Sequence, residues 1–228
     1  MNNKEALELW KNANIGSNVF CWGNGFIASG IRIFQKIESI ETAKRLSVER
    51  DIDYNIKHPT HVETKIDQKY DVSAEMEGVK EMSFERLLEE DQGLVLAEPI
   101  INTEEEEEWQ HRVVNYLKDY VNDESPYDYL GVLSFIYRSL GLFLPLKKIW
   151  KYDFKFARFC SEIASEVYLL KGGKHFISIE EDPSKISPLE MFHKVQESRL
   201  FRLTILKNPS KEIKIEKEKD GKIQVSRC

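Results

Sequence analysis

The chain has 228 residues, 41% of them hydrophobic, which is enough for one hydrophobic core. Its net charge of −6 argues against a dedicated nucleic-acid-binding protein, because such proteins carry basic surfaces. The three cysteines, Cys21, Cys160 and Cys228, are too few and too scattered for a disulfide framework or a structural zinc site. The sequence therefore predicts no metal and no cofactor.

Residues 1–10 are predicted to form a short amphipathic helix, and they lack the apolar core of a signal peptide. No stretch of the chain reaches the roughly 20 apolar residues of a membrane span. These features predict a cytoplasmic protein without an integral membrane segment.

The next part of the chain contains a short strand and a helix. Residues 17–22 are typical of a strand, and apolar residues at helical spacing predict a helix over 26–36. Residues 38–58 are polar, highly charged and weakly patterned. We interpret 38–58 as an inserted loop or lid rather than as part of the core.

From Thr60 onward the hydrophobic period changes to two, which is typical of strands. A small helix is predicted over 84–90, before the last of four strands, which cover 61–66, 70–76, 79–84 and 94–100. Together with the strand at 17–22, they make a small antiparallel sheet of about five strands. The predicted fold class is α+β, with helices packed on this sheet.

A strong helix start follows at Thr103, which precedes five consecutive glutamates. Thr103 and Glu106 fit a capping box, and the carboxylates favour the positive end of the helix dipole. The buried side of this helix is predicted to consist of Trp109, Val113, Leu117 and Tyr120. The acidic run is therefore interpreted as a helix start and not as a metal site.

Three more helices are predicted in the second half of the chain: one over about 130–140, one that carries Cys160, and one that begins after Ser187. No internal repeat or low-complexity linker interrupts the sequence. A single domain over 1–206 is the simplest interpretation, and the charged residues 207–228 form either a hairpin or a tail.

Cys160 has two interpretations. Apolar residues lie at its i+3, i+4 and i+7 positions, and this spacing by itself favours an inert core cysteine. Asp153, however, is a candidate N-cap, which would place Cys160 in the early turns of a helix, where the dipole lowers the pKa of a thiol.

A cysteine hydrolase also needs an imidazole and a polar group that orients it. His61 opens a predicted strand, and Glu75 lies on the next one, on the side away from Ala74. His61 and Glu75 share a face of the sheet only if the register of the two strands allows it.

Several short motifs occur in an order that resembles a known family. They are Gly16-Ser-Asn-Val-Phe20, Gly25-Phe-Ile-Ala-Ser-Gly-Ile-Arg32, Thr60-His-Val62, Ser73-Ala-Glu-Met-Glu-Gly-Val79, Tyr127-Asp128, Phe159-Cys-Ser-Glu162 and Ile186-Ser-Pro-Leu189. Over roughly residues 15 to 206 the chain resembles the circularly permuted branch of the NlpC-type papain-like cysteine hydrolases, whose familiar members are the YiiX-like proteins. In that branch the histidine precedes the cysteine, as it does here.

The resemblance implies a role for each matching residue. Cys160 corresponds to the nucleophile, and its backbone N–H helps to hold the oxyanion. His61 corresponds to the general base, and Glu75 to the group that orients His61. Glu162 matches the glutamate after the family's cysteine and is a candidate for substrate binding or for a structural role. The chain departs from the family at Asn18, where aspartate is common, and at Phe159, where an aromatic hydroxyl is common.

The expected function is thiol-dependent hydrolysis of an amide bond, in a cell-wall-type or other small peptide, through a Cys-His-Glu triad and an acyl-enzyme. Two alternatives remain open. One is an acyltransferase or hydrolase that acts on a lipid ester or amide with the same thiol chemistry. The other is a non-catalytic binding module that retains the fold. The expected partner is a small peptide or acyl substrate, and neither a nucleic acid nor an integral membrane segment is expected.

Overall fold

The computed structural model describes residues 1–22, 59–75, 77–90, 93–128, 159–179 and 182–207, together with the backbone of 213–217 and 223–227. The helices predicted over 26–36 and 130–140 and the insertion predicted over 38–58 lie outside the described residues.

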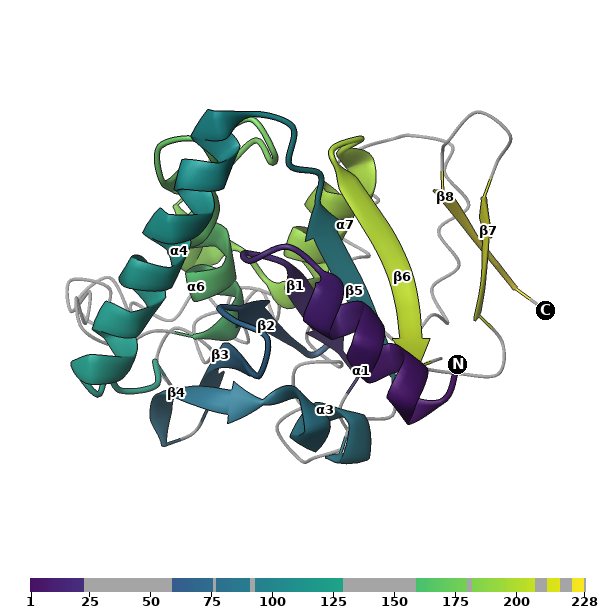
Figure 1. Ribbon diagram of the computed structural model, residues 1–228, viewed down its shortest axis with the longest axis horizontal. Coiled ribbons are helices and arrows are strands. Elements are labelled where there is room, and N and C mark those ends of the chain that lie inside the picture. The colour runs from purple at the N-terminus through teal and green to yellow at the C-terminus, as the bar shows by residue number, and fades with distance from the viewer. Residues whose placement is uncertain are drawn as a thin grey trace, which may run out of the picture.

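A six-stranded antiparallel sheet forms the centre of the fold, which confirms the α+β class and adds one strand to the predicted sheet (Figure 1). The strands are β1 (Asn18–Cys21), β2 (His61–Lys65), β3 (Tyr70–Glu75), β4 (Gly78–Ser83), β5 (Leu94–Pro99) and β6 (Phe201–Lys207). Their order in the sheet is β4-β3-β2-β1-β5-β6. The strands β2 to β4 form the predicted meander, whereas β5 pairs with β1 on the other side.

Helices cover both faces of this sheet. One face carries Val62, Val72 and Ala74 and packs against α4 (Glu104–Asn122), α6 (Cys160–Glu166) and α7 (Pro188–Glu197). We call it the Val62 face. The opposite face, the Val19 face, packs against α1 (Asn3–Asn12) and α3 (Phe84–Glu90). None of the helices within the described residues has the length and apolarity needed to cross a membrane.

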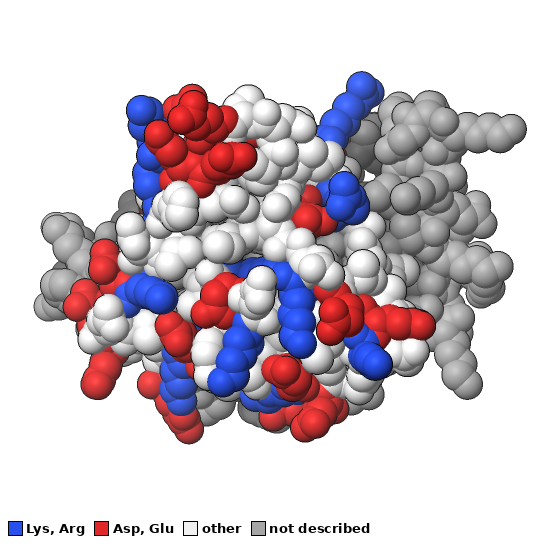
Figure 2. Space-filling model, viewed as in Figure 1, with Lys and Arg blue, Asp and Glu red and all other residues white. Residues whose placement is uncertain are grey.

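The helix α4 begins at the predicted capping box. Thr103 Oγ1 accepts a hydrogen bond from Glu106 N at 3.3 Å, and Glu106 Oε2 accepts one from Thr103 N at 2.8 Å. Acidic side chains gather where α4 begins, and both signs of charge are interspersed over the rest of the face seen in Figure 2. Trp109 is buried, and its Nε1 donates to Val167 O at 2.8 Å, which links α4 to the chain that follows α6.

Two further strands lie near the C-terminus. β7 (Ile213–Lys217) and β8 (Ile223–Arg227) pair with each other in an antiparallel hairpin. They form a two-stranded sheet separate from the central one (Figure 1).

A buried lysine joins α1 to the sheet. The ammonium group of Lys65 donates to the carbonyl oxygens of Trp10 at 2.5 Å, Lys11 at 2.8 Å and Ala13 at 2.6 Å. These carbonyls lie at the C-terminal end of α1, where most backbone acceptors lack intrahelical donors; Trp10 O also accepts from Ala13 N at 3.1 Å. Burial lowers the pKa of Lys65 to about 8, so it is still mainly charged at neutral pH.

We expect the substitution Lys65→Met to destabilise the protein by ~2–4 kcal/mol, because it leaves three acceptors without their shared donor. Urea denaturation measures the change. Lys11→Met is the matched control, since the Lys11 side chain is 39% exposed and pairs only with Glu8 among the ion pairs of the described residues. It should change the free energy of unfolding by less than about 0.5 kcal/mol. Equal effects of the two substitutions would contradict the role assigned to Lys65.

Candidate active site

Cys160 is the first residue of α6. The N-cap is Phe159, whose φ of −119° and ψ of 166° are extended. The predicted cap, Asp153, lies outside the described residues, and the helix begins at Cys160. The backbone N–H of Cys160 is therefore in the first turn, whose donors have no intrahelical acceptor. Ile163 and Ala164 are buried, as the packing interpretation predicts, so Cys160 combines a core environment with a place at a helix start.

Glu162 stabilises this helix start. Its side chain is buried, and Oε2 accepts a hydrogen bond from Phe159 N at 3.4 Å. This is the reciprocal half of a capping box, which satisfies one of the free donors at the N-terminus. The observed contact of Glu162 is thus structural.

His61 lies beside Cys160. The helix α6 packs against β2, and the two side chains lie close enough for a Cys160 thiolate to raise the pKa of His61. His61 is the first residue of β2, so its ring lies at the end of the strand, where groups from both faces of the sheet can reach it. Its side chain is 23% exposed. The structure therefore brings together the two residues that the sequence proposes as nucleophile and base.

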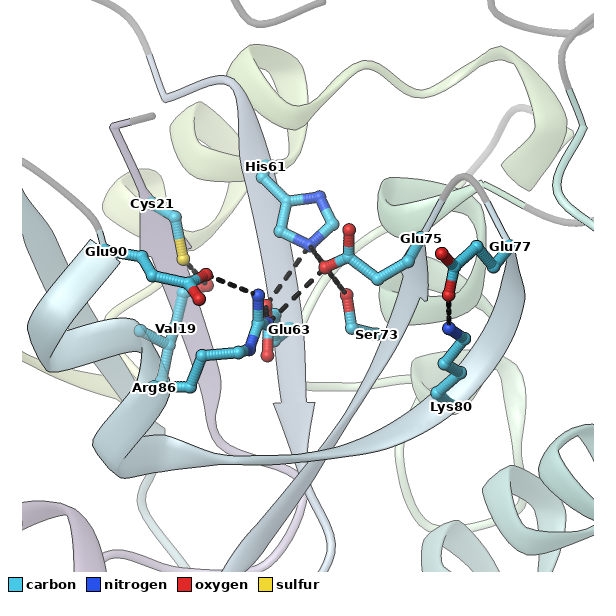
Figure 3. A network of polar contacts seen from close by, with 10 residues as sticks. All are labelled: Val19, Cys21, His61, Glu63, Ser73, Glu75, Glu77, Lys80, Arg86 and Glu90. Atoms are coloured by element: carbon cyan, nitrogen blue, oxygen red, sulfur yellow. Dashed lines mark hydrogen bonds and ion pairs between the residues drawn. The ribbon is translucent and has the colours of Figure 1, made fainter. Parts of the chain in front are cut away.

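The Nε2 atom of His61 is held by a chain of hydrogen bonds (Figure 3). It lies 2.8 Å from Ser73 Oγ, and the Ser73 hydroxyl donates to Glu75 Oε1 at 2.9 Å. Because the Ser73 proton is directed to Glu75, its oxygen accepts from Nε2–H. This arrangement places the proton of a neutral imidazole on Nε2 and leaves Nδ1 free to accept a proton.

The register of β2 and β3 explains why Glu75 is within reach. Thr64 pairs with Val72, and Lys65 pairs with Asp71. Extending this antiparallel register brings His61 opposite Glu75 on one face. His61 and Glu75 therefore share a face of the sheet, which the sequence alone did not decide.

Two carboxylates and one guanidinium surround Nε2. Glu63 Oε1 lies 3.3 Å from Nε2, and Glu75 Oε1 lies 3.6 Å from it. Arg86, on α3, contacts the same two oxygens through Nη2, at 3.0 Å and 3.4 Å. Glu75, the predicted orienting group, is therefore present, but Ser73 and Glu63 are closer to the ring.

Asp71 adds a second buried acid next to Glu63. Burial and the neighbouring charge of Glu63 raise the pKa of Asp71 well above its ordinary value. Burial also raises the pKa of Glu63, but a hydrogen bond from His61 and the charge of His61 outweigh it and lower that pKa. A protonated Asp71 can donate to Glu63 Oε2, which has no other hydrogen-bond partner among the described residues. Of the two acids, Asp71 is therefore the one that keeps a proton more readily.

The pKa of His61 reflects these neighbours. Burial lowers it, but the charge of a Cys160 thiolate, hydrogen bonds with Cys160 and Glu63, and the charge of Glu75 raise it well above 6.5. The imidazolium form is therefore favoured when the thiol has lost its proton. Such a site can stabilise a thiolate–imidazolium pair.

We expect Asp71→Asn to be tolerated at high pH. Native Asp71 keeps its proton where the unfolded chain has lost it, so its contribution to stability falls as pH rises from about 4 towards its raised native pKa. An asparagine side chain at this position has no such dependence, because it does not titrate. The variant should be at least as stable as the natural chain at pH 8, and its relative stability should fall at pH 5.

Urea denaturation at both pH values measures this difference. Asp119→Asn, on the exposed side of α4, is the control and should change stability by less than about 0.5 kcal/mol at both pH values. A loss of more than about 1 kcal/mol on replacing Asp71 at pH 8 would show that Asp71 is charged in the native state.

The ligand atoms of His61, Glu63 and Glu75 lie within 4.8 Å of one another, a spacing that a metal ion could also use. Arg86 Nη2, however, already lies against the two carboxylate oxygens nearest the ring. A metal at this point would have to displace a guanidinium held by both carboxylates. The observed cation of the cluster is Arg86.

Three residues of the site, Glu63, Ser73 and Arg86, were not predicted from the sequence. The available signal was the alternation of polar residues on both strands, which puts Glu63 and Ser73 on the face of His61. Asn18, at a position where the resembled family has aspartate, donates to Tyr168 OH at 2.8 Å and accepts from Thr64 at 2.9 Å. These observed contacts of Asn18 are structural.

Comparison of the chain with protein-family models, with curated proteins and with solved structures found no match.

Proposed function

We propose that the chain is a thiol-dependent hydrolase that cleaves an amide bond through an acyl-enzyme, with Cys160 as the nucleophile and His61 as the general base. The observation that carries this proposal is the packing of α6, which begins with a thiol, against the strand that begins with an imidazole whose Nε2 is held by Ser73 and Glu63. A nucleophile, a base and a group that orients the base are the three parts of such a site. The resemblance to the permuted NlpC-type hydrolases supports the same assignment.

In the first step His61 Nδ1 takes the thiol proton, and the Cys160 sulfur forms a bond to the carbonyl carbon of the substrate. The carbonyl π electrons move to the oxygen. The resulting oxyanion accepts a hydrogen bond from the backbone N–H of Cys160, which lies in the first turn of α6.

The tetrahedral intermediate then expels the amine. The carbon–nitrogen bond breaks, and His61 transfers its proton to the leaving nitrogen, which leaves a thioester on Cys160. His61 next takes a proton from water while the water oxygen attacks the thioester. The carbon–sulfur bond breaks, the carboxylic acid is released, and the thiolate–imidazolium pair forms again.

A cell-wall-type or other small peptide is the substrate class that we propose, following the resemblance. Hydrolysis or transfer on a lipid ester or amide uses the same steps with a different leaving group. A binding module would retain the fold without turnover. These three possibilities differ in the product that they release.

The experiment is to incubate the purified chain with cell-wall-type peptides, simple peptide amides and fatty-acyl esters, and to follow product release and the intact mass. Our proposal predicts release of an amine and a transient mass increase, equal to the acyl group, on the peptide that contains Cys160. Acylation from esters alone would favour the lipid alternative. Turnover that continues without Cys160, or binding without any acylation, would overturn the proposal.

A further inference from the structure

We propose that Glu63, rather than Glu75, is the carboxylate that stabilises the positive charge on His61 during the reaction, and that Arg86 fixes Glu63 in place. This inference rests on the proposed function and concerns the same site. Glu63 is a positioning residue, because it acts through His61 and not on the substrate. Glu75 has a different task, which is to direct the Ser73 hydroxyl.

Distance and burial both favour Glu63. Its Oε1 is 3.3 Å from His61 Nε2 and its side chain is 0% exposed, whereas Glu75 is 3.6 Å away and 33% exposed. The attraction between two charges is stronger where water is excluded and is screened where water has access. The buried carboxylate therefore interacts more strongly with an imidazolium than the partly exposed one does.

Arg86 holds Glu63 in this position. Nη2 contacts Glu63 Oε1 at 3.0 Å, and Nη1 contacts Glu90 Oε2 at 2.9 Å. The guanidinium is thus anchored at both ends, and α3 supplies both Arg86 and Glu90. A carboxylate fixed before the reaction needs no reorganisation when the imidazolium forms, which is what makes such stabilisation effective.

Asp71 bears on the charge of the cluster. Burial and the charge of Glu63 raise the pKa of Asp71, so of the two buried acids Glu63 is the one that more readily carries the negative charge. Glu75 reaches the ring mainly through Ser73, whose oxygen accepts from Nε2–H. Charge stabilisation by Glu63 and orientation by Ser73 and Glu75 are therefore separate contributions that can be measured separately.

The experiment is an NMR titration of the His61 ring, which needs no substrate, in Glu63→Gln and Glu75→Gln. We expect Glu63→Gln to lower the pKa of His61 by about one to three pH units, as loss of an opposite charge at this distance does. Glu75→Gln should lower it by less than about one pH unit, because the group is partly exposed. Hydrolysis should fall more in Glu63→Gln than in Glu75→Gln.

Two control variants separate this effect from general disturbance of the cluster. Asp71→Asn keeps the charge of Glu63, and Glu89→Gln changes an exposed carboxylate of α3 that contacts neither Arg86 nor His61 in any described interaction. Both should leave the pKa of His61 within about half a pH unit of its natural value. If Glu63→Gln folds poorly, or if Asp71 ionises in response, the same titration is made in the double variant Glu63→Gln/Asp71→Asn. This variant places two amide side chains next to each other and removes both acids.

The possible outcomes are distinct. A larger fall in the pKa of His61 on replacing Glu75 than on replacing Glu63, or an unchanged value in the double variant, would overturn the inference and leave the hydrolase proposal intact. If His61 titrates as we expect but Cys160 is never acylated, the role of Glu63 as a charge partner stands and the proposed reaction is wrong.

Discussion

Replacing Cys160 with serine is expected to reduce hydrolysis by at least about 10⁴-fold, because residues that act as one unit lose nearly all of their effect when the nucleophile is removed. The same variant should lower the pKa of His61. Burial lowers that pKa, and the Cys160 thiolate is the strongest influence that opposes burial. Serine has a hydroxyl group in place of the thiol and is similar in size to cysteine, but it does not ionise beside the imidazole.

Kinetics and an NMR titration of His61 measure the two effects in one variant. Cys228→Ser is the control, because no role in the reaction is assigned to Cys228, and it should leave both quantities unchanged. Loss of activity with an unchanged titration of His61 would mean that the two side chains do not interact in solution. Retained activity would remove Cys160 from the mechanism.

Replacing His61 with asparagine should have the second largest effect, a loss of activity of at least about 10³-fold, because it removes the acceptor and donor of every proton in the reaction. It should also change stability in a pH-dependent manner. The raised native pKa of His61 means that its stabilising contribution is fully present below about pH 6.5 and is lost as pH rises through the native pKa. The substitution should therefore cost more stability at pH 6 than at pH 9.

Urea denaturation at pH 6 and pH 9 checks the sign. His111→Asn, at an exposed position of α4, is the matched control. It should not cost more stability at pH 6 than at pH 9. A larger cost at pH 9 would mean that native His61 is held neutral, which would contradict a thiolate–imidazolium pair.

Local patterns predicted most of the central sheet. The predicted strands at 61–66 and 70–76 begin at the same residues as β2 and β3 and end one residue later. These strands could be predicted because the alternation of apolar residues is a local property of the chain. The strand β6, Phe201–Lys207, was not predicted, and neither was the pairing of β5 with β1. Both depend on which distant segments meet, and this is decided by the packing of the whole sheet.

The candidate site was predicted only in part. Cys160 and His61 came from the family resemblance together with their residue types, and Glu75 depended on a register that the sequence leaves open. The same alternation placed Glu75 on the side of its strand away from Ala74, but it did not predict that Glu63 and Asp71 on that side are fully buried. They are buried because α3 packs on this face and its Arg86 contacts Glu63. The sequence pattern within either strand does not predict that a helix covers this face.

The rate at which iodoacetamide alkylates Cys160 at neutral pH, with and without His61, tests the central claim most directly. Mass spectrometry of the peptide that contains Cys160 follows the reaction without any knowledge of the substrate. Alkylation needs a thiolate, and a neighbouring imidazolium favours it. We predict that His61→Ala reduces the rate at Cys160 by at least about tenfold, while the rate at Cys228 stays the same. Equal rates at Cys160 in the two proteins would contradict a Cys160–His61 nucleophilic pair.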